Sequence, residues 1–232
     1  LDVLPCTLEL PRRYAFRYLE IEVLAVSGRF QLTLEDAVCT SVTSAEEEKR
    51  IPFSGDGMDA ELDRVACNTM RSCMQLVFED GPKRDRRLWS GDLRLQALTD
   101  YYLFKNDKLA RRCLYLFTAC EEPNKYLPCC VFQKPSVFFD DGGILMDYAM
   151  IVAVSLCDYF EHTGDGDTAR ELFPVAKRQV EYALSLLDDK GIVTFPEWGW
   201  THFIDWAPRL EYTTACHGIL LYTLERMAAL AA

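Results

Sequence analysis

Residues 79–92 read EDGPKRDRRLWSGD, and this stretch decides the fold because it separates two runs of helical periodicity. It holds four acidic and four basic residues, a Gly-Pro turn, a tryptophan and a second glycine. Asp80, Asp85 and Asp92 are spaced five and seven residues apart, so they cannot share one face of a single helix. They can converge if the segment folds as a loop between two helices.

Two interpretations of this loop are open on composition alone. Carboxyl groups that converge on a sugar can divide acid and base roles, and neighbouring arginines then influence which carboxyl stays ionised. The simpler interpretation is a helix end, a turn at Gly81-Pro82, helix caps and surface ion pairs. Composition by itself favours the simpler one.

The chain on both sides of the loop is predicted to be helical. Apolar residues recur at helical spacing from Met58 to Val77. The run 144–161 is apolar over most of its circumference, which indicates a buried helix, and Pro174 indicates a kink in a later one. Further helices are expected at 92–104, 107–118, 165–187 and 211–230.

Short and long connections alternate along this helical region. The long ones fall at 79–91, 121–143 and 188–210, and long loops in compact domains are often functional. Helix hairpins with elaborated loops on one side suit a toroid of helix pairs. We therefore predict a mainly α fold, in which residues 58–230 form part of an (α/α)6 toroid of the six-hairpin type. About six helices are expected, where a complete toroid needs about twelve.

The first 50 residues have a different pattern. Apolar and charged residues alternate from Tyr14 to Val26, and β-branched and aromatic residues resume from Phe30 to Val42. This pattern predicts strands within 14–43, which should pair with further strands or pack on the helices, because two strands alone are marginal. The chain therefore divides into 1–50 and 51–232. It starts at Leu1 without a signal peptide pattern, which we interpret as the edge of a longer chain.

Composition excludes several classes of partner. Half of the 232 residues are hydrophobic, so a sizeable core is expected, and a net charge of −11 argues against nucleic acid and anionic membrane surfaces. No run of about 18 apolar residues occurs. Five of the ten cysteines lie in predicted helices, Cys129-Cys130 are adjacent, and no CxxC pair exists. We therefore expect reduced thiols, no metal site and a cytoplasmic location.

A second candidate segment, FPEWGWTHFIDWAP at 195–208, contains three of the four tryptophans. Aromatic rings on a loop can stack on the C–H faces of a sugar while carboxylates bind its hydroxyls. The alternative is that Trp198 and Trp200 pack the loop onto the helices. Glu197 is an acid in the same loop, and a lone His202 is more typical of a structural residue than of a catalyst.

Residues 80–92 resemble the signature of the α-L-rhamnosidases, family 78 of the glycoside hydrolases. That signature runs Asp-Cys-Pro-x-Arg-(Glu/Asp)-Arg-x-x-Trp-x-Gly-Asp, and this chain has DGPKRDRRLWSGD, without a gap over thirteen positions. Gly81 replaces the frequent Cys, and Asp85 occupies the place of the usual Glu. The helix that follows resembles the family's next helix. The strands predicted before the loop resemble the end of the β-sandwich that precedes the family's barrel.

The resemblance implies an inverting hydrolase that removes terminal α-L-rhamnose and needs no cofactor. Asp85 would be the general acid, and Arg84 would set the charge state of the binding carboxylates. The substrate-binding residues would be Asp80, Arg84, Trp89, Asp92, Glu197, Trp198, Trp200, Asp205 and Trp206, where Asp205-Trp206 resembles the family's Gly-Asp-Trp. The general base comes later in the family's barrel, so we expect this chain alone to be inactive.

Two alternatives stand beside this reading of the sequence. The chain could be a non-catalytic, carbohydrate-binding or scaffolding helical domain, which the Asp85 departure favours slightly. It could also be a toroid glycosidase or lyase for another sugar. Activity on an aryl α-L-rhamnoside distinguishes the three.

Overall fold

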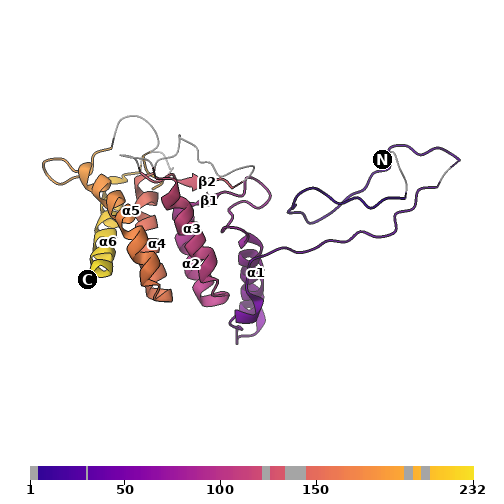
Figure 1. Cartoon of the computed structure of the whole chain (residues 1–232), viewed down its shortest axis with the longest axis horizontal. Coiled ribbons are helices and arrows are strands. Elements are labelled where there is room, and N and C mark those ends of the chain that lie inside the picture. Colours follow the sequence, from indigo (N-terminus) through magenta and orange to yellow (C-terminus); the bar gives the residue numbers. More distant parts are fainter. Residues whose placement is uncertain (1–4, 30, 122–125, 134–144, 196–200, 205–209) are drawn as a thin grey trace.

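The computed structural model describes residues 5–29, 31–121, 126–133, 145–195, 201–204 and 210–232 (Figure 1). Within these ranges the chain is mainly helical, and the six helices predicted from periodicity are confirmed. The elements in chain order are η1 (Glu47–Lys49), α1 (Gly57–Cys73), β1 (Leu88–Trp89), α2 (Ser90–Leu103), α3 (Asp107–Ala119), β2 (Cys130–Val131), α4 (Met146–Thr163), α5 (Gly166–Ser185) and α6 (Thr213–Ala231).

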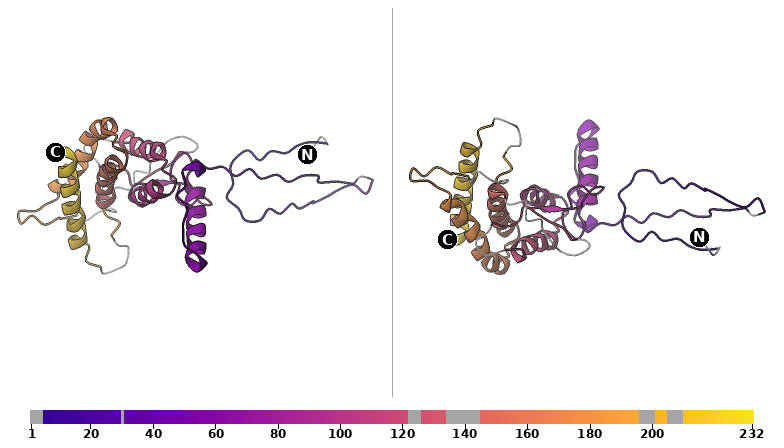
Figure 2. Two further views of the ribbon diagram at one scale, coloured as in Figure 1. Left: turned by 90° about the horizontal axis from the view of Figure 1, so that it is seen from below. Right: turned by 90° about the horizontal axis from the view of Figure 1, so that it is seen from above.

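Helix α4 is the centre of the helical region. It contacts α2 and α6 on either side in one row and α3 and α5 in a neighbouring row, as the two views of Figure 2 show. Thirteen of its 18 residues are buried, which confirms the buried helix predicted at 144–161. Consecutive helices from α2 to α6 therefore alternate between the two rows, which is the arrangement that helix hairpins produce.

Helix α1 ends at Cys73, short of the end predicted at Val77. The chain turns there, with a bridge between Met74 and Phe78 and a hydrogen bond from the Gln75 amide to the Val77 carbonyl at 3.0 Å. Val77 and Phe78 are nonetheless fully buried. The apolar pattern therefore runs past the helix because a turn, rather than a helix face, delivers these side chains to the core.

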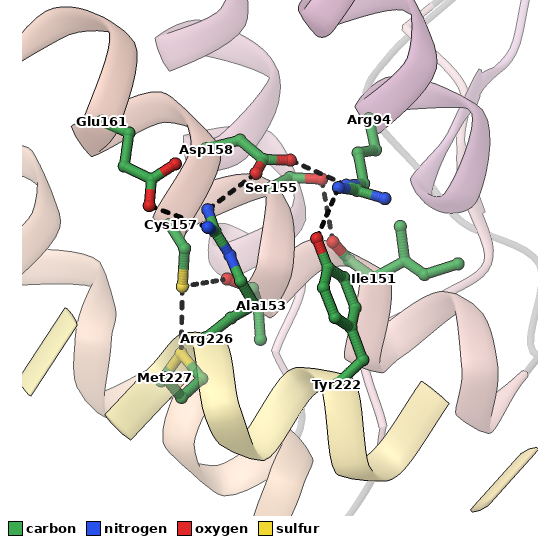
Figure 3. A network of polar contacts seen from close by, with 10 residues as sticks. All are labelled: Arg94, Ile151, Ala153, Ser155, Cys157, Asp158, Glu161, Tyr222, Arg226 and Met227. Atoms are coloured by element: carbon green, nitrogen blue, oxygen red, sulfur yellow. Dashed lines mark hydrogen bonds and ion pairs between the residues drawn. The ribbon is translucent and has the colours of Figure 1, made fainter. Parts of the chain in front are cut away.

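An ion network joins α2, α4 and α6, the three helices that lie in one row (Figure 3). Asp158 of α4 accepts hydrogen bonds from Arg94 of α2 at 2.7 Å and from Arg226 of α6 at 2.8 Å. Arg226 also pairs with Glu161, and Arg94 donates to the Tyr222 hydroxyl at 2.9 Å. The Asp158 side chain is only 8% exposed, so its charge is compensated inside the protein rather than by water.

The strands predicted within 14–43 are not formed. The described part of this segment contains no strand, and it extends away from the helices in Figure 1. Its apolar side chains are exposed, with Tyr18 and Leu24 among the most exposed, at 80% and 85%. The alternating pattern encodes a strand only when a sheet covers one of its faces, and a pair of strands without that cover is marginal.

Seven of the ten cysteines are buried. Cysteine therefore serves mainly as a small core residue here. Among the described residues, no helix is both long enough and apolar enough to cross a bilayer.

Candidate active site

The loop predicted at residues 79–92 is a closed turn between α1 and α2. The Asp80 amide donates to the Arg87 carbonyl at 2.8 Å, so the two ends of the loop lie together. Inside it, the Arg84 amide donates to the Gly81 carbonyl at 2.7 Å. Gly81 and Arg86 both have positive φ, at 55° and 56°. The loop is thus bent tightly enough to bring side chains at its start and its middle together.

Gly81 has a steric reason to be glycine. A Cβ at this position would lie 3.0 Å from the Arg84 Nε and 3.2 Å from the Asp85 Oδ1. A side chain there would crowd both groups and would also strain the left-handed backbone. The replacement of the family's frequent Cys by Gly81 therefore agrees with the conformation of this loop.

Arg84 and Arg87 bring the first two motif carboxylates into one ion cluster. Arg84 donates to the Asp80 carboxylate at 2.8 Å, and its Nε lies 3.6 Å from Asp85. Arg87 approaches the same Asp85 oxygen at 2.9 Å. The structure thus brings Asp80, Arg84 and Asp85 together, which both interpretations of the loop allow. Arg84 contacts these two acids, whereas Asp92 is paired differently.

Three buried polar atoms in this part of the loop make no hydrogen bond within the described residues, and one of them, the Arg87 Nε, is ion-paired with Asp85. The Asp85 Oδ1 and the Trp89 Nε1 are buried, and neither has a hydrogen-bond partner in the described part of the chain. Buried polar atoms are usually satisfied in folded proteins. Both atoms therefore retain hydrogen-bonding capacity at residues expected to meet substrate.

At the end of the motif, Trp89 lies on β1 and Asp92 lies in the first turn of α2. β1 pairs antiparallel with β2, with Trp89 opposite Cys130. The Trp89 ring lies edge-on to Tyr148 at 6.3 Å, and the Arg87 guanidinium lies 5.6 Å from its centroid. Asp92 accepts a hydrogen bond from the Tyr148 hydroxyl at 3.1 Å. Tyr148 therefore joins the tryptophan and the third acid of the motif.

The second candidate loop is fixed to the start of α4 through residues 201–204. The Asp147 carboxylate accepts hydrogen bonds from the Phe203 and Ile204 amides at 2.8–3.0 Å, and the Met146 amide donates to the Thr201 carbonyl at 2.9 Å. Burial raises the pKa of Asp147, and the amides that donate to it oppose that rise. A buried carboxylate with several amide donors is a strong local anchor.

Five predicted substrate-binding residues lie outside the described residues, namely Glu197, Trp198, Trp200, Asp205 and Trp206. That Asp80, Asp85, Asp92 and Asp205 point into one common cleft therefore stays a prediction. Of the three that are described, Asp80 and Asp85 share one ion cluster, while Asp92 bonds to Tyr148.

His202 has the surroundings of a structural residue. Its ring stacks on Tyr212 with centroids 3.8 Å apart and lies 4.9 Å from Phe195. Burial lowers its pKa, and the charge of Asp147 works against that change. These ring contacts agree with the structural role that its isolation in the sequence suggested.

Sequence reasoning missed Asp147, Tyr148 and Phe203. One signal for Asp147 was present, because it is the only charged residue between Leu145 and Asp158 in an otherwise apolar helix. A charge is rarely buried without a partner, so it pointed to a polar anchor. Tyr148 and Phe203 carried no comparable signal, since aromatic residues at such positions usually belong to the core.

Two known domains match this chain. The bacterial alpha-L-rhamnosidase 6 hairpin glycosidase domain matches residues 55–229. The glycosyl hydrolase family 78 alpha-rhamnosidase N-terminal domain matches residues 1–41. No curated protein matches the sequence.

Solved structures of two rhamnosidases are similar to the chain. A rhamnosidase from Klebsiella oxytoca with rhamnose bound is 46% identical, with a TM-score of 0.70 over 74% of this chain and 33% of that chain. The GH78 family rhamnosidase of Bacillus sp. GL1 is 26% identical, with a TM-score of 0.62 over 72% of this chain and 17% of that chain. This chain thus spans a third or less of their length. Since the six-hairpin domain matches most of the sequence and one rhamnosidase is 46% identical over 74% of this chain, the chain belongs to the α-L-rhamnosidases of glycoside hydrolase family 78.

Proposed function

We propose that this chain forms part of a glycoside hydrolase that removes terminal α-L-rhamnose with inversion of configuration. The observation that carries the proposal is the loop at 80–92. It matches the family motif without a gap, and it holds Asp80 and Asp85 together through Arg84. The rhamnose bound in the Klebsiella oxytoca relative supports rhamnose as the sugar.

In this proposal Asp85 protonates the departing glycosidic oxygen. It is partly buried, and its Oδ1 has no partner among the described residues, so one oxygen is uncommitted before substrate arrives. Arg84 and Arg87 hold the other oxygen and orient the group. Glu79, the acid that directly precedes the motif, is held through both oxygens by Arg13 at 2.5 and 2.6 Å. Asp85 is therefore the better placed carboxyl for proton transfer.

Asp80 and Asp92 bind the sugar hydroxyls in this proposal, and Trp89 supplies an apolar face with an unused N–H. Glu197, Trp198, Trp200, Asp205 and Trp206 close the pocket from the second loop. An inverting enzyme also needs a base carboxylate about 6.5–9.5 Å from the acid to activate water. We place that base in the part of the relatives' length that this chain does not span, and we place the helices in an (α/α)6 toroid completed there.

The test is the stereochemistry of the reaction. The full-length protein is incubated with an aryl α-L-rhamnoside, and proton NMR follows the anomer that is released first. The proposal predicts β-L-rhamnose, which then mutarotates. Release of the α anomer first would contradict inversion. Binding of rhamnose without hydrolysis of any rhamnoside would favour a non-catalytic carbohydrate-binding domain.

A further inference from the structure

Tyr148 lies between the two loops of the candidate site. It is the third residue of α4 and is only 7% exposed, and its hydroxyl donates to Asp92 Oδ2 at 3.1 Å. Burial raises the pKa of the phenol, and the Asp92 charge raises it further. The hydroxyl is therefore protonated at neutral pH and acts as a donor to Asp92.

The motif glycine Gly91 makes this approach possible. A Cβ at Gly91 would lie 2.4–2.6 Å from three atoms of the Tyr148 ring, well inside van der Waals contact. Gly91 directly precedes Asp92 in the chain. The ring therefore passes over a backbone without a side chain and reaches the carboxylate of the next residue.

The second loop also contacts Tyr148. The Phe203 ring lies 5.0 Å from the Tyr148 ring, and the Phe203 amide is held by Asp147. Trp89 contacts the same ring edge-on. Because Asp147 and Tyr148 are adjacent, the first turn of α4 fixes the second loop with one side chain and Asp92 with the next.

We propose that Tyr148 is a positioning residue that orients Asp92 for sugar binding, with Phe203 and Asp147 holding Tyr148 in place. This inference rests on the proposed function, since it assigns Asp92 a sugar hydroxyl. A free aspartate side chain can turn between rotamers, and the Tyr148 hydroxyl selects one of them. The remaining oxygen of Asp92 is then directed toward the ligand.

The experiment replaces Tyr148 by phenylalanine in the full-length protein, which removes the hydroxyl and keeps the ring. Tyr159→Phe is the matched control, because Tyr159 is also a buried α4 tyrosine whose hydroxyl donates to a carboxylate, Asp165, at 2.8 Å. Eleven residues of helix, about 16 Å, separate the two tyrosines. Both variants lose one equivalent bond, but only one of them faces the candidate site.

The readouts are the Kd for rhamnose and the separate kcat and KM values on an activated aryl rhamnoside. Tyr148→Phe is expected to raise Kd and KM about tenfold and to change kcat little, because a binding group acts on ground state and transition state alike. Tyr159→Phe should leave all three values unchanged. Unchanged Kd and KM in Tyr148→Phe would overturn the proposal.

A second comparison asks whether Tyr148 acts through Asp92. In an Asp92→Asn background, Tyr148→Phe should add little further loss of kcat/KM, because the group that it orients is already altered. An equal loss in both backgrounds would contradict the positioning role. If the wild-type protein bound no rhamnose, the proposed function would fail. Crystal structures would then decide this inference, since an Asp92 side chain that keeps its rotamer in Tyr148→Phe overturns it.

Discussion

Glu79, the residue directly before the motif at 80–92, is held by an ion pair with the N-terminal segment. Its side chain is almost fully buried and is bound through both oxygens by Arg13, which comes from the extended N-terminal segment. The Arg13 carbonyl in turn accepts a hydrogen bond from Arg86 at 2.7 Å. The N-terminal segment thus supports the loop at 80–92 through both groups of Arg13.

Asp100 predicts a pH dependence of stability. Burial raises its pKa to about 7, although the Asn106 amide that donates to it opposes the rise. The folded state therefore holds this proton more tightly than the unfolded state does. The resulting stabilisation is complete below about pH 4 and is lost as pH rises to about 7. Asp100→Asn removes this pH dependence of stability. The free energy of unfolding of the variant should therefore rise relative to that of wild type between about pH 4 and about pH 7.

Urea unfolding at a series of pH values measures that difference. The free energy of unfolding of Asp100→Asn minus that of wild type should increase from pH 4 to pH 7 and stay constant above. Asp59→Asn, at an exposed position of α1, is the control for removing one negative charge. A difference that does not depend on pH would show that Asp100 binds no extra proton in the folded protein.

Gly91 predicts a steric effect on stability. Gly91→Ala pushes a methyl group into the Tyr148 ring and should destabilise the protein by about 1–3 kcal/mol. Gly218→Ala in α6 is the matched control, since a Cβ there meets nothing within 4 Å. The control should stabilise the helix by about 0.5–1 kcal/mol. Thermal unfolding compares the two, and equal stability would mean that Tyr148 does not pack as described.

At the scale of elements, the ion network of Asp158 sets the alignment of α2, α4 and α6. Asp158→Asn leaves Arg94 and Arg226 without their shared carboxylate and should cost about 3 kcal/mol, because breaking a buried pair strands its partners. Asp167→Asn is the control, since Asp167 forms an exposed pair with Arg170 and should cost less than about 1 kcal/mol. Chemical denaturation measures both, and a loss of similar size in the two variants would contradict a buried network.

Local sequence patterns predicted the helices but not the contacts between distant segments. Six apolar periodicities located six helices, since each helix buries one face whatever its neighbours are. The pairing of Trp89 with Cys130 and the bond of Tyr148 to Asp92 join positions about 40 and 56 residues apart. No local pattern encodes such contacts. The strands predicted within 14–43 are not formed, because their alternating pattern produces a strand only where a sheet covers one of its faces.

At the scale of the whole molecule, the long connections and the motif meet where α2 and α4 begin. β1 leads directly into α2, and the segment 201–204 is bonded to the first residues of α4. Motif recognition could place Asp80, Asp85 and Asp92 at this end of the helices. It could not assign their partners, because arginines and aromatic residues that are distant in the sequence decide which carboxylate oxygen is left without one. The central claim is that Asp85, which is ion-paired through Oδ2 and has no hydrogen-bond partner for Oδ1 among the described residues, donates the proton.

The most direct test compares Asp85→Asn on two leaving groups in the full-length protein. The aglycone of a natural rhamnoside is a poor leaving group as an alkoxide and needs the proton, so turnover of natural rhamnosides should fall by about 10²–10⁴-fold. The phenolate of an activated aryl rhamnoside departs without much protonation, so turnover of that substrate should fall far less. Asp80→Asn should impair both substrates similarly, because a sugar-binding residue acts whatever leaves. If Asp85→Asn is silent on both substrates, or slows both equally, Asp85 is not the general acid.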